Sequence, residues 1–256
     1  MDTFKVATFN MQFGQAWDEA DPDNAPVHIE DTLAFLRTID ADIFLLQEVE
    51  RAQKGGVQAD PPINYTFLRE GLPGYDSVFA YPEINPQELP FGIALAIFSR
   101  WKLHDFDIAH LPPPDIQFEF QNEIVKPSFR QLISARTNVS GREISLLNTH
   151  LQAFFMIDAT SNEFCEQRNI VEQQLRSQNL PTILGGDFNC SPEENIAGQL
   201  LKAGYNTAQN EEITWRRRPY VLDHLFYNPQ LRTISHKVVP TPCSDHHLVV
   251  AEFAFV

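Results

Sequence analysis

The chain has 256 residues, of which 43% are hydrophobic and 21% are charged, which is the ordinary composition of a globular protein. Its 19 basic and 34 acidic residues give a formal net charge of −15 at pH 7, which argues against a stable duplex DNA partner. The sequence has no apolar run of about 18 residues and opens without a secretory leader. We therefore expect a cytoplasmic protein without a transmembrane segment.

The sequence also gives no sign of a division into separate domains. No internal repeat, low-complexity tract or Gly/Ser linker interrupts it, and the prolines at 112–114 are typical of a stiff loop. We predict one domain that spans residues 1–256.

Short apolar runs rich in β-branched and aromatic residues recur along the chain and predict strands. These runs are Phe4–Phe9, Asp42–Leu46, Gly92–Phe98, Gln131–Val139, Glu143–Asn148, Thr182–Leu184, Val221–Tyr227 and His247–Phe255. The fourth and fifth runs are joined through Ser140 and Gly141, a dipeptide suited to a tight antiparallel hairpin.

Two segments have the apolar spacing of amphipathic helices, Val27–Thr38 and Phe164–Ser177. Strands interleaved with helices predict an α/β sandwich. Two long stretches, Arg51–Pro62 and Asp105–Pro127, are predicted to be irregular loops, and the second is the candidate for a lid over the site.

Polar side chains stand at the ends of several predicted strands. Because ligands of α/β folds bind at strand ends, these residues are expected to converge on one pocket. They are Asn10, Glu48, His150, Asp187, Asn189, Asp223, Asp245 and His246. Taken singly, each has a structural explanation as well, such as a turn amide, a solvated strand end or a hydrogen-bonded histidine.

The densest positive run of the chain is Arg216–Arg218, which precedes the strand that carries Asp223. We predict that Arg216 and Arg218 bind a substrate phosphate or carboxylate, with a solvated loop as the alternative. The nearby rings of Trp215 and Tyr220 either stack on a base, meet an acyl chain or pack in the core.

Six short motifs occur in an order and spacing that resemble the endonuclease/exonuclease/phosphatase superfamily. They are Thr8–Asn10, Leu46–Glu48, Asn148–His150, Gly185–Asn189, Leu222–His224 and Ser244–His246. The third motif contains His150, and in this it is similar to the motif of the neutral sphingomyelinase, inositol phosphatase and deadenylase branches, which place a histidine here. The resemblance implies a four-layer α/β sandwich of two mixed β-sheets flanked by helices, the deoxyribonuclease-I-like fold.

The resemblance also implies roles for the residues of these motifs. Asn10, Glu48 and Asp245 would hold Mg²⁺, for which Mn²⁺ is a possible substitute. The catalytic residues would be His150, Asp187, Asn189, Asp223 and His246, of which Asp223 fixes the tautomer of His246. Asn10, Asn189 and His150 would also contact the substrate.

The function implied is that of a divalent-metal-dependent phosphoesterase, first of all a phosphodiesterase in which an activated water attacks phosphorus directly. The substrate is a small, lipid-linked or nucleic-acid phosphoester. A metal-dependent nuclease acting on DNA or RNA is the alternative within the same fold. A catalytically silent binding module is a third reading, because a fold alone does not guarantee activity.

Overall fold

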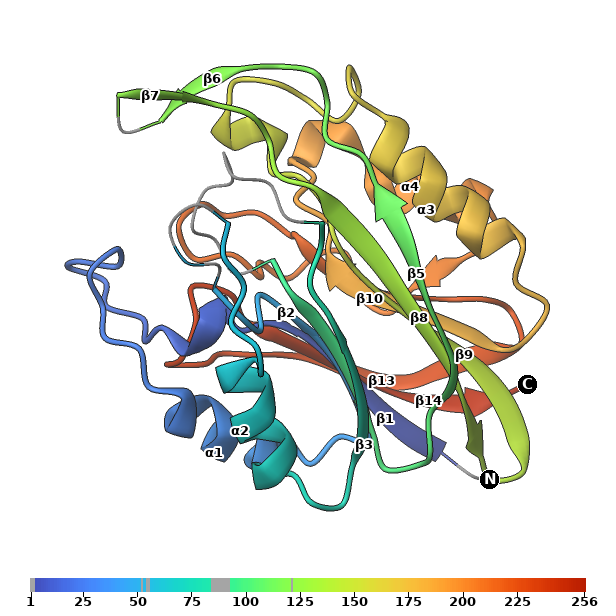
Figure 1. Cartoon of the computed structure of the whole chain (residues 1–256). Coiled ribbons are helices and arrows are strands. Elements are labelled where there is room, and N and C mark those ends of the chain that lie inside the picture. The colour runs from blue at the N-terminus through green and yellow to red at the C-terminus, as the bar shows by residue number, and fades with distance from the viewer. Residues whose placement is uncertain (1–2, 52, 54–55, 84–92, 121) are drawn as a thin grey trace.

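The computed structural model describes residues 3–51, 53, 56–83, 93–120 and 122–256. Two six-stranded sheets lie face to face, and helices cover their outer faces (Figure 1). The strand order of the first sheet is β13-β14-β1-β2-β4-β3, and that of the second sheet is β11-β12-β10-β9-β8-β5. In each sheet one pair is parallel, β1 with β2 and β9 with β10, while the remaining pairs are antiparallel.

The first sheet contains β1 (Thr3–Asn10), β2 (Ile43–Gln47), β3 (Asp76–Ala80), β4 (Leu95–Ser99), β13 (Leu231–Val239) and β14 (Leu248–Phe255). The second contains β5 (His104–Leu111), β8 (Arg130–Val139), β9 (Arg142–His150), β10 (Thr182–Asp187), β11 (Asn206–Thr207) and β12 (Asp223–Tyr227). A separate hairpin is formed by β6 (Phe118–Phe120) and β7 (Glu123–Val125). The helices are α1 (Ile29–Ile39), α2 (Ile63–Gly71), α3 (Glu166–Arg176) and α4 (Ile196–Lys202), with 3₁₀ turns at Gln12–Gly14, Phe154–Met156 and Pro192–Glu194.

Three apolar layers hold the sandwich together. The central layer lies between the sheets and includes Leu45 and Leu146, both fully buried. Leu36 of α1 packs with Phe44 on the outer face of the first sheet, and Val171 of α3 packs with Leu184 on the outer face of the second. Helix, sheet, sheet and helix therefore form four layers, and the predicted fold is confirmed.

All eight predicted strands and both predicted helices are present, with ends that differ by a few residues. The first residue of the predicted strand Gly92–Phe98 lies outside the described residues. The prediction missed β3, β5, β6, β7, β11, β13, α2 and α4. Several of these strands lie at sheet edges, where exposed polar residues interrupt the apolar pattern, as in β13.

The prediction of an irregular loop over Asp105–Pro127 was wrong. Most of β5 and the whole β6-β7 hairpin lie within it, and β5 pairs along β8 as the edge strand of the second sheet. Four of the eight residues of β5 are exposed in succession, which hides the alternation of a strand. Within Arg51–Pro62, residues 52, 54 and 55 lie outside the description, and the remainder is irregular apart from one bridge between Gln53 and Val57.

Each helix is short, the longest having 11 residues, and within the described parts of the chain no helix has the length and apolarity needed to cross a bilayer.

A polar junction crosses the apolar layer between the two sheets. The side-chain amide of Gln47 donates to the Asn148 Oδ1 atom at 2.6 Å and to the Thr8 Oγ1 atom at 3.0 Å. The Asn148 amide in turn donates to the backbone carbonyls of Leu46 and Ala96 at 2.8 and 3.0 Å. Since an unsatisfied polar group is costly in this layer, the junction fixes how the second sheet sits on the first.

Replacing Asn148 by leucine is expected to lower the free energy of unfolding by about 3 kcal/mol. The substitution leaves the Gln47 amide and two carbonyl groups without these partners, at about 1–3 kcal/mol for each group that stays unsatisfied. Urea denaturation followed by circular dichroism measures the change. Asn138→Leu is the matched control, because Asn138 is exposed on neighbouring β8, and its effect is expected to stay within about 0.5 kcal/mol. Equal losses in the two variants would contradict a special role for the junction.

Candidate active site

The polar residues of the second sheet lie in one row across three strands. His150 ends β9, Asp187 ends β10 and Asp223 begins β12. The strand register pairs Asp187 with His150 on one side and with Asp223 on the other. Because side chains in one cross-strand row point to the same face, the register itself brings these three groups together.

The residues contributed by the first sheet come from two neighbouring strand ends and one strand start. Asn10 ends β1, and Glu48 follows β2. Ser244, Asp245 and His246 precede β14, which runs antiparallel to β1 and so begins beside the end of β1. The Ser244 hydroxyl donates to the carbonyl of Asn10 at 2.7 Å, which ties the two segments together.

The backbone turns sharply at the residues that follow these strands. Glu48 and Asn189 have φ values of 49° and 46°, a left-handed conformation that is uncommon for residues other than glycine. A side chain at Gly186 would place its Cβ atom 2.3 Å from the carbonyl oxygen of Thr149, so only glycine allows β10 to lie this close to β9. The glycine before Asp187 is therefore required by the site's own geometry.

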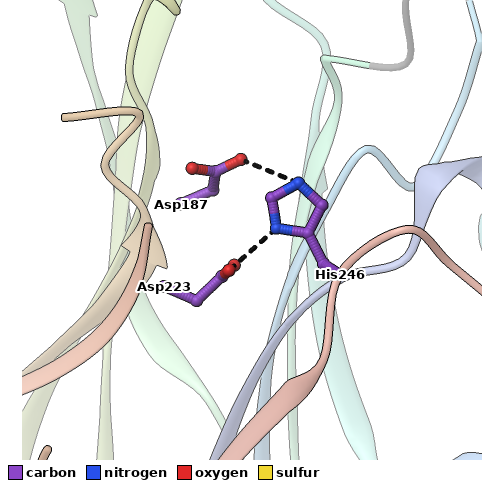
Figure 2. Close-up of side chains that lie close together, drawn as sticks. All are labelled: Asp187, Asp223 and His246. Atoms are coloured by element: carbon purple, nitrogen blue, oxygen red, sulfur yellow. Dashed lines mark hydrogen bonds and ion pairs between the residues drawn. The ribbon is translucent and has the colours of Figure 1, made fainter. Parts of the chain in front are cut away.

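The imidazole of His246 lies between two carboxylates (Figure 2). Its Nδ1 atom donates to the Asp223 Oδ2 atom at 2.8 Å, and its Nε2 atom lies 3.7 Å from the Asp187 Oδ2 atom. Burial alone would lower the pKa of His246, but the charges of Asp223 and Asp187 raise it to about 10. At neutral pH the ring is therefore an imidazolium that presents one N–H to each carboxylate.

A second carboxylate pocket adjoins this group. The Asn10 amide donates to the Glu48 Oε1 atom and to the Asp187 Oδ2 atom, both at 3.0 Å. Burial, with the charge of Asp245 in addition, raises the pKa of Glu48 to about 7, and burial raises that of Asp187 as well.

These buried acids form a site that suits a hard divalent cation, which prefers oxygen ligands and would offset their mutual repulsion. Ligand atoms of Asp187, Asp223 and His246 also lie within 4.8 Å of one another, which is close enough for a metal site. The imidazolium has no free nitrogen lone pair for an ion, however. The oxygen atoms of Glu48 and Asp245 are therefore the better fit, and the His246 group is better suited to holding a proton. The Asn10 Oδ1 atom accepts from the Gln12 backbone N–H at 3.1 Å, while its amide N–H groups face Glu48 and Asp187.

His150 and Asn189 complete the interior of the site. The His150 Nε2 atom lies 3.5 Å from the Asp187 Oδ2 atom and 3.9 Å from the Glu48 Oε1 atom, and its other ring nitrogen faces Arg130. Burial, followed by the positive charges of Arg130 and His246, holds the pKa of His150 well below its usual value. Asn189 donates from its backbone N–H to the Asp187 Oδ1 atom at 2.9 Å.

The three successive arginines have different environments. Arg216 donates to the carbonyl of Thr241 and lies over the ring of Trp17, whereas the side chain of Arg218 is near the rings of Phe155 and Tyr220. Arg217, the middle residue of the run, donates to the Asp245 Oδ2 atom at 2.6 Å, a contact that the sequence did not predict. The Trp215 indole donates to the same oxygen at 3.3 Å, so one side of the Asp245 carboxylate is held by two donors.

An aromatic wall, formed by Trp215, Phe155 and Tyr220, extends outward from His246. The ring centres of Trp215 and His246 are 6.3 Å apart, and those of Phe155 lie 5.4 and 5.5 Å from Trp215 and Tyr220. Trp215 is buried, while Phe155 and Tyr220 are half-buried. The wall therefore begins at the buried imidazolium and ends near the exposed guanidinium of Arg218.

The thiol of Cys190, which lies beside the site, is not activated as a nucleophile. Cys190 lies one residue from Asn189, but burial raises the pKa of its thiol to about 12. It stays protonated at neutral pH, and a protonated thiol is a poor nucleophile.

Arg130 is a charged residue near the site that the sequence did not indicate. It directly precedes the predicted strand Gln131–Val139 and is the first residue of β8, but it belongs to none of the six motifs. Since β8 runs antiparallel to β9, its beginning lies beside the end of β9 where His150 stands. Its place at the start of an antiparallel neighbour of β9 is the signal that could have identified it.

The sequence matches the family described as Endonuclease/Exonuclease/phosphatase over residues 7–246, which includes every motif residue of the site. The chain belongs to this family. Members of the endonuclease/exonuclease/phosphatase family are hydrolases of phosphoester bonds, so the strand-end cluster is the candidate active site of such a hydrolase.

The chain is similar to several proteins of known sequence or structure. The UPF0294 protein plu0699 of Photorhabdus laumondii is 28% identical over 139 residues, which cover 51% of this chain and half of that relative. An endonuclease/exonuclease/phosphatase of Beutenbergia cavernae has a TM-score of 0.74 at 19% identity, over 100% of this chain and 72% of that one. TDP2 of D. rerio, solved with a single-stranded DNA product, has a TM-score of 0.70 at 18% identity, over 99% and 100% of the two chains. At these identities the two structures establish the shared fold.

The ion pair between His246 and Asp223 predicts a pH-dependent contribution to stability. The folded-state pKa of His246 is about 10 against an ordinary value of 6.5, so the stabilisation is complete below about pH 6.5 and is lost as pH rises through 10. The difference in free energy of unfolding between the wild type and Asp223→Asn, measured in urea without metal, should therefore shrink as pH rises over this window.

Nuclear magnetic resonance of the imidazole nitrogens tests the same ion pair directly. His246 should stay protonated at pH 8 in the wild type and lose its proton at lower pH in Asp223→Asn. Asp105→Asn, which removes an exposed carboxylate paired with Arg136, is the control and should leave His246 unchanged. A wild-type ring that is neutral at pH 7 would contradict the assignment.

Proposed function

We propose that the chain is a divalent-metal-dependent phosphodiesterase that hydrolyses a P–O bond by direct attack of an activated water. The observation that carries the proposal is the pairing of two unlike centres in one buried site. One is an imidazolium held between two carboxylates, and the other is a group of buried carboxylates, of which Glu48 and Asp187 accept from the Asn10 amide. Phosphoester hydrolysis needs donors for developing negative charge and acceptors that orient a water, and the site holds both.

In this proposal Glu48 and Asp245 would hold Mg²⁺, and Asn10 would join them by turning its amide oxygen toward the ion; Mn²⁺ can replace Mg²⁺. The cation supplies neutralisation of the charge on the phosphoryl oxygens. Arg217 and the Trp215 indole fix the orientation of Asp245 by binding its Oδ2 atom.

The remaining residues act on the water and on the phosphoryl group. The carboxylate of Asp187, held by the Asn10 amide and the Asn189 backbone N–H, orients the attacking water and accepts its proton. Its raised pKa makes it a stronger base than an exposed aspartate.

The His246 imidazolium gives its Nε2 proton to the leaving oxygen as the P–O bond breaks, and Asp223 orients the ring and stabilises its charge through the Nδ1 atom. His150 and the side chain of Asn189 contact the phosphoryl group from the second sheet. Arg216 and Arg218 remain proposed contacts to the more distant part of the substrate, and Arg218 is the more exposed of the two.

A nuclease is the second candidate function, and the aromatic wall is the observation that favours it. Half-buried rings beside a guanidinium are suited to stacking on unpaired bases. TDP2 of D. rerio, which shares the fold, binds a single-stranded DNA product. The net charge of −15 favours an unpaired or small substrate over duplex DNA.

Removing the Glu48 carboxylate should abolish most turnover. We expect Glu48→Gln to lower kcat/KM for bis-p-nitrophenyl phosphate about 10²- to 10⁴-fold, which corresponds to several kcal/mol of lost transition-state stabilisation. The assay is run with Mg²⁺ and Mn²⁺, and chelation by EDTA should abolish wild-type activity. Glu143→Gln, at a partly exposed glutamate near the start of β9, is the matched control and should retain activity.

The turnover of the wild type and of Glu48→Gln is then compared on single-stranded and duplex DNA, RNA, sphingomyelin and inositol phosphates. The compound that only the wild type hydrolyses identifies the substrate class. Metal-independent turnover, or turnover that Glu48→Gln leaves intact, would overturn the proposed function. Binding of a partner that survives Glu48→Gln without any turnover would instead support the silent binding module.

The aromatic wall makes a separate prediction for the nuclease candidate. Phe155→Ala should raise KM for a single-stranded oligonucleotide about 5- to 100-fold, since stacking contributes about 1–3 kcal/mol per base. It should change KM for bis-p-nitrophenyl phosphate little. Phe106→Ala, at an exposed ring of β5, is the control. An unchanged oligonucleotide KM would remove the stacking role.

A further inference from the structure

We propose that Arg130 is a positioning residue that holds His150 as a neutral imidazole with its proton on the Nε2 atom, so that His150 donates a hydrogen bond to a phosphoryl oxygen. This inference deepens the proposed function, and its kinetic part rests on it. The statement about the tautomer concerns the resting protein and can be tested without any substrate.

The fold places Arg130 directly behind the imidazole. β8 begins at Arg130 and pairs antiparallel with β9, with Leu132 opposite Thr149, so the start of β8 lies beside the end of β9. The Arg130 Nη1 atom is 3.2 Å from the His150 Nδ1 atom. The two residues are 7% and 4% exposed, so little water is available to replace this contact.

The chemistry of the two groups determines which one donates. A guanidinium carries only donors and stays charged in proteins, so the His150 Nδ1 atom must be the acceptor. A neutral imidazole that accepts at one nitrogen carries its proton on the other. The proton of His150 is therefore on the Nε2 atom.

The opposite side of the ring agrees with this tautomer. The Nε2 atom faces the Asp187 Oδ2 atom at 3.5 Å, and a carboxylate oxygen is an acceptor. With the proton on the Nδ1 atom, an N–H would point at the guanidinium and a lone pair would point at the Asp187 carboxylate. A doubly protonated ring would again direct an N–H at Arg130. Only the Nε2 tautomer suits both sides.

His150 and His246 are thereby given different tasks by their partners. His246 has the carboxylate of Asp223 at its Nδ1 atom, which favours the imidazolium. His150 has a guanidinium at the same atom, which favours the neutral ring. A neutral imidazole N–H is a hydrogen-bond donor but a very weak acid, so His150 stabilises charge on a phosphoryl oxygen and leaves proton transfer to other groups.

The first test is the tautomer of His150 in the purified chain with Mg²⁺, read from the ¹⁵N chemical shifts of the imidazole ring at pH 7.5. We expect a protonated Nε2 atom and an unprotonated Nδ1 atom in the wild type. A protonated Nδ1 atom, in either the neutral or the charged ring, overturns the proposal. This wild-type measurement can overturn the proposal even if a variant fails to fold.

The second test compares three variants. Arg130→Met keeps a long side chain but removes every donor, and we expect the Nε2 tautomer to lose its dominance and kcat to fall about 10- to 100-fold with a smaller change in KM. Arg130→Lys retains a charged donor, so it should keep part of the Nε2 tautomer and part of kcat. Arg136→Met, at an exposed arginine of the same strand, is the matched control and should change neither the tautomer of His150 nor kcat.

The outcomes separate this inference from the proposed function. If Arg130→Met leaves the tautomer unchanged, or lowers kcat no more than Arg136→Met does, Arg130 is not a positioning residue. If the wild type hydrolyses nothing in the panel but shows the Nε2 tautomer that Arg130→Met loses, the proposed function fails while the positioning by Arg130 stands.

Discussion

The amide junction between Gln47 and Asn148 is the contact on which the geometry of the site depends. The two sheets meet through apolar side chains, which attract without specifying direction, and a purely apolar interface would allow one sheet to shift over the other. Gln47 immediately precedes Glu48, and Asn148 stands two residues before His150. The directional hydrogen bonds of this pair therefore set the separation between the Glu48 and His150 side chains, one from each sheet, at 3.9 Å.

Above this junction the site concentrates acidic groups that the fold keeps away from water. Burial raises the pKa of Glu48 to about 7, and the repulsion among the acids is offset in three different ways. His246 supplies a positive charge between Asp187 and Asp223, Arg217 pairs with Asp245, and Asn10 donates to Glu48 and Asp187. Under the proposed function, a bound cation would reduce the remaining repulsion among the acids and would lower the cost of binding an anionic phosphoryl group beside them.

Much of this arrangement could be predicted from the sequence, because strand ends carry a readable signature. Asn10, Glu48, His150 and Asp187 each follow an apolar run, and the structure places them together through short contacts. Arg130 and the contact of Arg217 with Asp245 could not be identified in this way, because they depend on which strands are neighbours and on how a loop folds back. The edge strand β5 was missed for a related reason, since its polar outer residues hide its pairing with β8.

The row formed by His150, Asp187 and Asp223 has a consequence for how such a protein can change over time. Because the three side chains are aligned by strand register, adding or deleting one residue within β9, β10 or β12 would put a neighbour in the place of a proposed catalytic group and reverse the face on which the others lie. The lengths of these strands are therefore constrained, whereas the segments that leave their ends, such as the one carrying Phe155 and the one carrying Arg218, can gain or lose residues without displacing the row. Insertions and deletions in those segments would alter the surroundings of the row and leave its geometry unchanged.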